Sequence, residues 1–422
     1  MRFLILIACA GTAFAQDTLR LTLAEAEKLA IQNNPQFGAA KLNAAASYEV
    51  PVELRANALP TMFGSITAVG ADSGSRLAAG ALNNPVVYNR LGTGVSVSQM
   101  ISDFGRNGNL VESAKLRAQA QDQLTETTRA QILLATDRAY FAVLRAQSVL
   151  KVAEQTLDAR KLVVDQVTAL AQSNLKSQLD VSFASVNLSD AKLLLAGARN
   201  DIQAAQTQLV TAMGIPGQKA IELSEEPMPD VLPDQVAPLI QGALQKRPEL
   251  ANVHLEQSAA ERFAQAERAL QYPTIGLFGT AGVVPVGQDV IPRTYGAVGV
   301  NINVPIFNGG LFKARRTEAD LRAKAVAQNG NDLANRISRD VKVAYLNAST
   351  AFERLGLTAQ LLEQAKLALD LSQSRYDLGL SSIIELSQAQ LNLTSAQIVS
   401  ASAKYDYQAQ RSVLAFETGD LR

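Results

Sequence analysis

The chain has 422 residues, and its 39 Lys and Arg balance its 39 Asp and Glu, so the formal net charge is zero. This balance argues against a polynucleotide partner, because nucleic-acid-binding domains present a basic surface. With a single histidine (His254) and a single cysteine (Cys9), a His-based triad, a Cys–His pair or a zinc cluster would lack its parts. We therefore expect no enzyme, no cofactor and no metal site.

The first residues predict a secretory signal peptide. A positive start at Met1–Arg2 is followed by an apolar stretch, Phe3–Ala10, and a small-residue cleavage site, Ala13–Ala15. We expect a signal peptide over residues 1–15. The residues before Cys9 also resemble a lipobox, so lipidation of that cysteine stays open. No later run reaches the ~18 apolar residues of a membrane helix, and any later membrane span must therefore be β.

The chain contains an internal duplication. Gly105–Gly214 aligns without a gap with Gly310–Gly419, and a second alignment places Pro35 on Pro248. The two halves are therefore two copies of one structural unit. We predict four parts after the signal peptide: a first repeat over 16–214, a linker over 215–231, a second repeat over 232–419 and a C-terminal tail over 420–422.

Each repeat is expected to start with helical sequence and to continue with two strands. In the first repeat, Leu23–Leu59 predicts helix broken at Pro35 and Pro51, and Pro60 ends it. Apolar residues then alternate with small or polar ones, a period of two that is typical of strands with two different faces. The predicted strands are at about 61–69 and 88–100, and at about 274–283 and 295–305. Loops are expected at about Gly70–Val87 and Val284–Thr294.

A soluble β-sandwich also explains such alternation, but four strands cannot close a barrel within one chain and their edges need partners. Strands with an apolar and a polar face suit a barrel with lipid outside and water inside. Three copies would supply twelve strands. Together with the signal peptide, this favours a membrane barrel shared among chains.

Long helices follow the strands in both repeats. Gly105 to about Gln172 contains no proline, and roughly 65 residues at 1.5 Å each give a helix of about 100 Å. Lys313 to about Asp377 repeats this segment. Apolar residues at intervals of seven predict coiled-coil packing. Returning helices are expected over about Gln178–Met213 and Ile383–Thr418, with left-handed caps at the glycines that follow.

Several segments resemble the TolC family of outer-membrane efflux and secretion channels. They are Leu21–Ala26 with Asn34-Pro35, Val304–Gly310 with its counterpart Ser102–Arg106, and Arg375–Leu380 with Ile384–Leu386. Their order, spacing and duplication cover essentially the whole mature sequence.

The resemblance implies a mainly α fold with a small membrane β part. Long coiled-coil hairpins would form a trimeric α-barrel across the periplasm, and four strands per chain would form a twelve-stranded β-barrel in outer-membrane lipid. It implies a homotrimeric, non-enzymatic channel for efflux of small molecules. The partners would be a periplasmic adaptor (membrane fusion) protein and an inner-membrane pump of the RND or ABC type.

One acidic residue shortly before each helix reversal is a candidate for a periplasmic constriction. In a trimer, Asp370 and its repeat mate Asp165 could direct three plus three carboxylates toward the bore. The alternative is a solvated outer face, where Lys366 and Lys161, four residues earlier, would form ordinary i,i+4 ion pairs.

The helix reversals themselves are candidates for contact with the adaptor. Turn chemistry explains Gly379 and a capping Ser382, but it does not explain an exposed leucine at the same place in both repeats. By resemblance, we expect the tips to touch the adaptor. They comprise Gly379, Leu380, Ser381, Ser382, Leu175, Lys176 and Ser177.

Two other functions stay open. A duct for type I polypeptide secretion would share the whole architecture, since cargo choice resides mostly in the pump. A periplasmic coiled-coil adaptor or scaffold without a pore is less favoured, because an adaptor would carry one helical hairpin rather than two.

Overall fold

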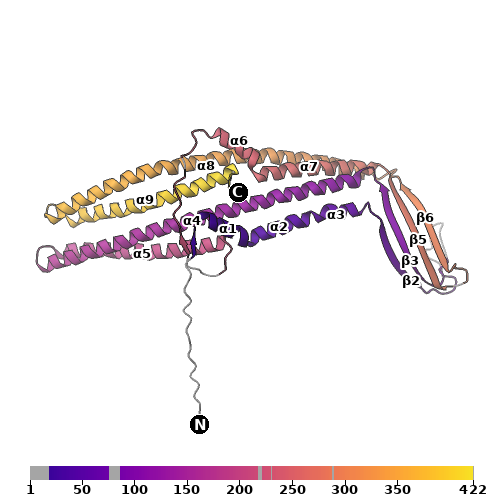
Figure 1. Ribbon diagram of the computed structural model, residues 1–422, viewed down its shortest axis with the longest axis horizontal. Helices are drawn as coiled ribbons and strands as arrows, with labels where there is room; N and C mark the ends of the chain where they lie inside the picture. The colour runs from indigo at the N-terminus through magenta and orange to yellow at the C-terminus, as the bar shows by residue number, and fades with distance from the viewer. Residues whose placement is uncertain (1–18, 76–85, 217–220, 230, 288, 422) are drawn as a thin grey trace, which may run out of the picture. The chain divides into compact units, whose positions relative to one another are not determined.

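The structure is a computed structural model that describes residues 19–75, 86–216, 221–229, 231–287 and 289–421 (Figure 1). The predicted signal peptide and Cys9 lie outside these residues. The chain divides into two compact units, which we call the hairpin unit and the sheet unit. The hairpin unit comprises the described residues of Met1–Ala40, Glu126–Arg247 and Ala334–Arg422, and the sheet unit comprises those of Lys41–Thr125 and Pro248–Leu333. Each unit takes segments from both sequence repeats.

The sheet unit contains one antiparallel sheet with the strand order β2-β3-β5-β6. The outer edges of β2 and β6 carry no further strand among the described residues. Since neighbouring strands alternate in direction, β2 and β6 also run in opposite directions. The strands are β2 (Thr61–Val69), β3 (Arg90–Ser102), β5 (Thr274–Gly287) and β6 (Thr294–Asn303).

The two faces of the sheet differ in chemistry, as the alternation predicts. On β6, Val298, Val300 and Ile302 share one face and are 79%, 62% and 59% exposed. Gly299 and Asn301 lie between them and face the other way. The strand ends at Asn303, before Val304 and Pro305. An exposed apolar face of this kind marks a surface that contacts something other than water.

The long helices have matching lengths in the two repeats. Helix α4 (Arg106–Gln172) and helix α8 (Leu311–Asp377) have 67 residues each. The returning helices α5 (Gln178–Ala212) and α9 (Ile383–Thr418) have 35 and 36. These pairs confirm the mainly helical, duplicated fold. None of the described helices is apolar over a stretch long enough to cross a membrane.

Each returning helix is followed by a glycine in the left-handed conformation, as predicted. Gly214 has φ 66° and Gly419 has φ 76°. A Cβ on Gly214 would lie 2.7 Å from the carbonyl oxygen of Asn33, so the glycine is required by backbone contact as well as by its own φ.

The short helices near the start of each repeat correct one expectation. The first repeat has α1 (Leu23–Asn33), α2 (Pro35–Ser47) and α3 (Glu49–Ala56), so the chain breaks at Tyr48 and not at Pro51. Pro51 lies in the first turn of α3, where a missing N–H removes no helical hydrogen bond. The second repeat has α6 (Ala237–Lys246), α7 (Pro248–Arg268) and the 3-10 turn Ala269–Gln271.

A parallel strand pair, β1 (Leu19–Leu21) and β4 (Ile221–Leu223), joins the start of the first repeat to the linker that follows it, within the hairpin unit. Tyr140 of α4 is fully buried beneath this pair, and its hydroxyl donates to the carbonyl oxygen of Ser224 at 2.6 Å. Leu209 of α5 and Met213, the residue that caps this helix, belong to the apolar cluster around Tyr140.

Candidate functional site

The two helix reversals of the hairpin unit adopt the same backbone turn. After α8, Gly379 has φ 74°, and the Leu380 N–H donates to the carbonyl of Arg375 at 2.8 Å. After α4, Asn174 has φ 57°, and the Leu175 N–H donates to the carbonyl of Leu170 at 2.9 Å. Glycine and asparagine are the residues that enter this left-handed region most readily. The sequence identified Gly379 but not Asn174 as the left-handed residue.

Serine caps the helix that leaves each turn. Ser177 Oγ accepts the N–H of Asp180 at 3.2 Å, and Asp180 Oδ2 accepts the N–H of Ser177 at 2.9 Å, which completes a capping box. Ser382 Oγ accepts the N–H of Glu385 at 3.4 Å, as expected from the sequence. These bonds satisfy amide groups that a helix start leaves without partners.

The two leucines at the turns are exposed. Leu175 is 70% and Leu380 is 67% exposed, and both follow the left-handed residue directly. Ser381 is half-buried beside Leu380. An apolar side chain held at the apex of a rigid turn is available for a partner, because the turn's own bonds do not use it.

Lys176, by contrast, is half-buried and contacts another segment of the same chain. Its Nζ donates to the carbonyl oxygen of Tyr376 at 3.2 Å and lies 3.7 Å from the centroid of the Tyr376 ring. The sequence grouped Lys176 with the exposed tip residues. The structure assigns it to a contact between the α4–α5 hairpin and the α8–α9 hairpin.

Apolar packing also joins the two hairpins behind the turns. Val167 of α4 packs in one buried cluster with Tyr376, Ile383 and Leu386 of the second hairpin. Farther along, the Asn187 side chain donates to Ser387 Oγ at 2.8 Å. This cluster fixes the register of one hairpin on the other.

A buried arginine lies along the same seam and was not found from the sequence. Arg160 of α4 is 5% exposed and donates to the side-chain oxygen of Gln390 on α9. Burial lowers the pKa of this guanidinium. Its repeat mate is Ala365, so the duplication gave no signal for the pair.

Asp165 and Asp370, the predicted constriction residues, are exposed in the chain. Among the described residues no ion pair joins Asp165 to Lys161 or Asp370 to Lys366. Neither carboxylate therefore forms the ordinary i,i+4 pair with the lysine four residues earlier. Gln373, one turn after Asp370, donates its side-chain amide to Asp377 at 2.9 Å.

The described part of the chain contains no cluster of three or more His, Cys, Asp or Glu side chains arranged to hold a metal ion. His254 is exposed on α7.

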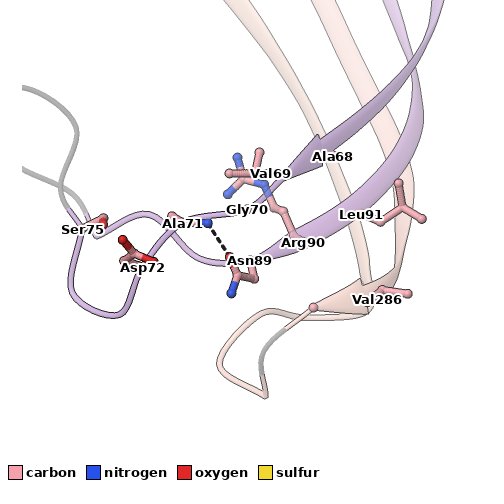
Figure 2. Close-up of a pocket in the computed structure, with 11 residues that line it drawn as sticks. Ala68, Val69, Gly70, Ala71, Asp72, Ser75, Asn89, Arg90, Leu91 and Val286 are labelled. Carbon is pink, nitrogen blue, oxygen red and sulfur yellow. Dashed lines mark hydrogen bonds between the residues drawn. The ribbon is translucent and has the colours of Figure 1, made fainter.

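An open cavity of about 1000 Å³ lies at the end of the sheet where β2 finishes and β3 begins (Figure 2). Asn89 Oδ1 accepts the N–H of Ala71 at 2.6 Å, the bond drawn dashed in Figure 2, and draws the ends of the two strands together. Asp72 and Arg90 are the charged residues of its lining. Part of the expected Gly70–Val87 loop lies outside the described residues, and we assign no binding site to this cavity.

Comparison with known proteins identifies the family. The sequence model described as outer membrane efflux protein matches residues 27–215 and 239–420, and the chain belongs to that family. It is similar to the outer membrane protein TolC of Escherichia coli, with 24% identity over 96% of this chain and 83% of TolC. It is also similar to the pyoverdine export outer membrane protein OpmQ of Pseudomonas aeruginosa, with 26% identity over 72% of this chain. That match spans 64% of the length of OpmQ.

The fold agrees with the family. The crystal structure of CusC superposes with a TM-score of 0.83 at 18% identity, covering 94% of this chain and 92% of CusC. In CusC, conformational changes accompany folding and the formation of a transmembrane channel.

Proposed function

We propose that this chain forms a homotrimeric outer-membrane channel for the efflux of small molecules. The observation that supports it most is the four-stranded sheet, which has an exposed apolar face and, among the described residues, two unpaired edges. An exposed sheet edge with free N–H and C=O groups needs a partner. Because β2 and β6 run in opposite directions, β6 of one copy can pair with β2 of the next in the antiparallel sense.

Three copies would close twelve strands into a barrel with the apolar face toward lipid. In lipid, every backbone polar group must be paired within the protein, and a closed barrel meets that demand. The hairpin units would extend into the periplasm. The chain would supply a passive aqueous path, and the energy for transport would come from an inner-membrane pump of the RND or ABC type.

The proposed contact with the periplasmic adaptor is at the helix reversals. The apolar contacts would be Leu175 and Leu380, and Ser381 follows Leu380 in the same turn. Gly379, Lys176, Ser177 and Ser382 would hold the two turns in shape through the bonds described above. Asp370 and Asp165 would line a cation-favouring constriction just before the turns.

The test is purification of the mature protein from outer membranes in detergent, followed by electron microscopy and planar-bilayer recording. We expect a three-fold particle that conducts ions. A monomeric particle, or a trimer that leaves the bilayer silent, would contradict the proposal.

A further inference from the structure

Three aromatic rings lie on the face of the sheet that otherwise carries mostly small and polar side chains. Phe63 of β2 stands opposite Ser96 of β3 and is 65% exposed. The other two rings belong to Phe278 and Tyr295.

Phe278 of β5 stands opposite Gly299 of β6 and next to Ser98 of β3. Tyr295 of β6 stands opposite Gly282 of β5, which in turn pairs with Gly94 of β3. Both rings therefore have a glycine as their cross-strand neighbour.

The Phe278 ring occupies the space that a side chain on Gly299 would need. A Cβ built on Gly299 would lie 2.5 Å from Cζ and 2.7 Å from Cε1 of that ring, and its three nearest atoms all belong to the ring. Distances below 3 Å are not tolerated between carbon atoms, so the ring can lie there only because residue 299 has no Cβ.

The Tyr295 ring extends farther, across two strands. A Cβ on Gly94 would lie 3.0 Å from Cζ of Tyr295 and would also overlap the phenol oxygen. A Cβ on Gly282 would overlap both the ring and the phenol oxygen. The three residues form one row across β3, β5 and β6, with the ring over the two glycines.

The rings are only partly covered in this position. Phe278 is 46% and Tyr295 is 42% exposed, so each keeps one side toward the space above this face. Neighbours on the same face, such as Ser98 and Ala297, have short side chains. A ring displaced from its glycine would therefore project beyond these short neighbours.

We propose that Phe278 and Tyr295 narrow the aqueous path through the strand section, and that their glycine partners limit this narrowing by letting the rings lie flat. The inference rests on the proposed function, in which the small-residue face lines the bore. Pore diameter and lining then determine which solutes pass.

A simpler role for the rings is to cover glycine backbone and so protect the strand ladder. That role predicts an effect on stability but none on conductance. The two roles are therefore separated by recordings from single channels.

Gly299→Ala is the informative substitution, because its new Cβ meets the Phe278 ring first and would displace it toward the bore. Gly94 and Gly282 are less suitable, since a Cβ on Gly94 would also lie 2.9 Å from the carbonyl oxygen of Ala281. The matched control is Gly296→Ala on the opposite face of the same strand, where the nearest atom to a Cβ is 3.8 Å away.

Single-channel conductance of the full-length variants is measured in planar bilayers. We expect a loss of conductance in Gly299→Ala, none in Gly296→Ala, and recovery to at least the parent value in the Phe278→Ala/Gly299→Ala double variant. Phe278→Ala and Tyr295→Ala should each raise conductance, and they test the proposal even if Gly299→Ala does not fold.

Equal conductance in the parent, Phe278→Ala and Tyr295→Ala channels would overturn the inference and leave the channel function intact. A parent protein that forms no channel would instead overturn the proposed function, and this inference with it.

Discussion

The Nζ atom of Lys176 lies 3.7 Å from the centroid of the Tyr376 ring and donates to the Tyr376 carbonyl oxygen at 3.2 Å. Lys176 belongs to the turn between α4 and α5, and Tyr376 to the last turn of α8. Burial, followed by the nearby carboxylates of Asp180 and Asp377, raises the pKa of Tyr376 to about 12. The phenol therefore stays neutral at physiological pH, and the ammonium group is the charged partner in the contact.

Lys176→Met should loosen the contact between the two hairpins. The substitution keeps the aliphatic stem and removes both the hydrogen bond and the cation–π contact, which together contribute about 1–2 kcal/mol. We expect faster amide hydrogen exchange in the turn from Leu378 to Ser382. Lys161→Met, an exposed lysine on the same hairpin, is the control. Unchanged exchange in Lys176→Met would show that the apolar cluster alone holds the turns together.

Asp137→Asn should change how stability depends on pH. Asp137 of α4 is 1% exposed and bonds Ser412 of α9, with Glu27 of α1 beside it; burial, and then Glu27, raises its pKa to about 8. Between the unfolded value near 3.8 and this pKa, the folded chain binds more protons than the unfolded one. The contribution of the Asp137 carboxyl to the free energy of unfolding is therefore complete below about pH 4. It is lost as the pH rises toward 8, and the free energy of unfolding falls by at most about 1.4 kcal/mol per pH unit.

Apparent melting temperatures at pH 5, 6.5 and 8 check this prediction. The parent should lose stability along the series more steeply than Asp137→Asn, whose amide stays neutral. Asp190→Asn, an exposed position on α5, should follow the parent. Parallel curves for the parent and Asp137→Asn would show that the carboxyl is already charged in the folded chain.

Asp370→Asn and Asp165→Asn should weaken the preference of the channel for cations. In the proposed trimer each substitution removes three carboxylates, and a ring of carboxylates favours cations in a pore. The measurement is the reversal potential under a salt gradient across a planar bilayer. Asp201→Asn, toward the other end of α5, is the control. A reversal potential equal to that of the parent would place these carboxylates outside the bore.

Leu175→Ser and Leu380→Ser should reduce efflux without changing trimer formation or conductance. Each removes an apolar side chain at a turn apex, where burying a leucine against a partner contributes about 1.5–3 kcal/mol. Drug susceptibility of cells that depend on this channel measures efflux. Leu193→Ser, 71% exposed but far from the turns, is the comparison. Full efflux in both tip variants would contradict the proposed adaptor contact at the two leucines.

Much of the fold was predictable because its signals are local. The alternation of Val298, Val300 and Ile302 with smaller residues predicts a two-faced strand, since side chains on a strand alternate with a period of two. Gly379 and Ser382 predict a turn and a cap from their own conformational and bonding preferences. The duplication added a second copy of each signal. The expected break at Pro51 was wrong, because proline is tolerated in the first turn of a helix.

The sequence by itself determined the duplicated order of helices and strands, the turns and the exposed leucines at their apices. Only the tertiary structure decided that Lys176 lies on Tyr376, that Arg160 meets Gln390, and that the rings of Phe278 and Tyr295 lie on Gly299 and Gly282. Turns and periodicity depend on neighbours a few residues apart. These contacts depend instead on the register between different helices or strands. In the hairpins, the residues in contact are some two hundred positions apart in the sequence. No single segment encodes that register, because it is set by how complementary surfaces pack.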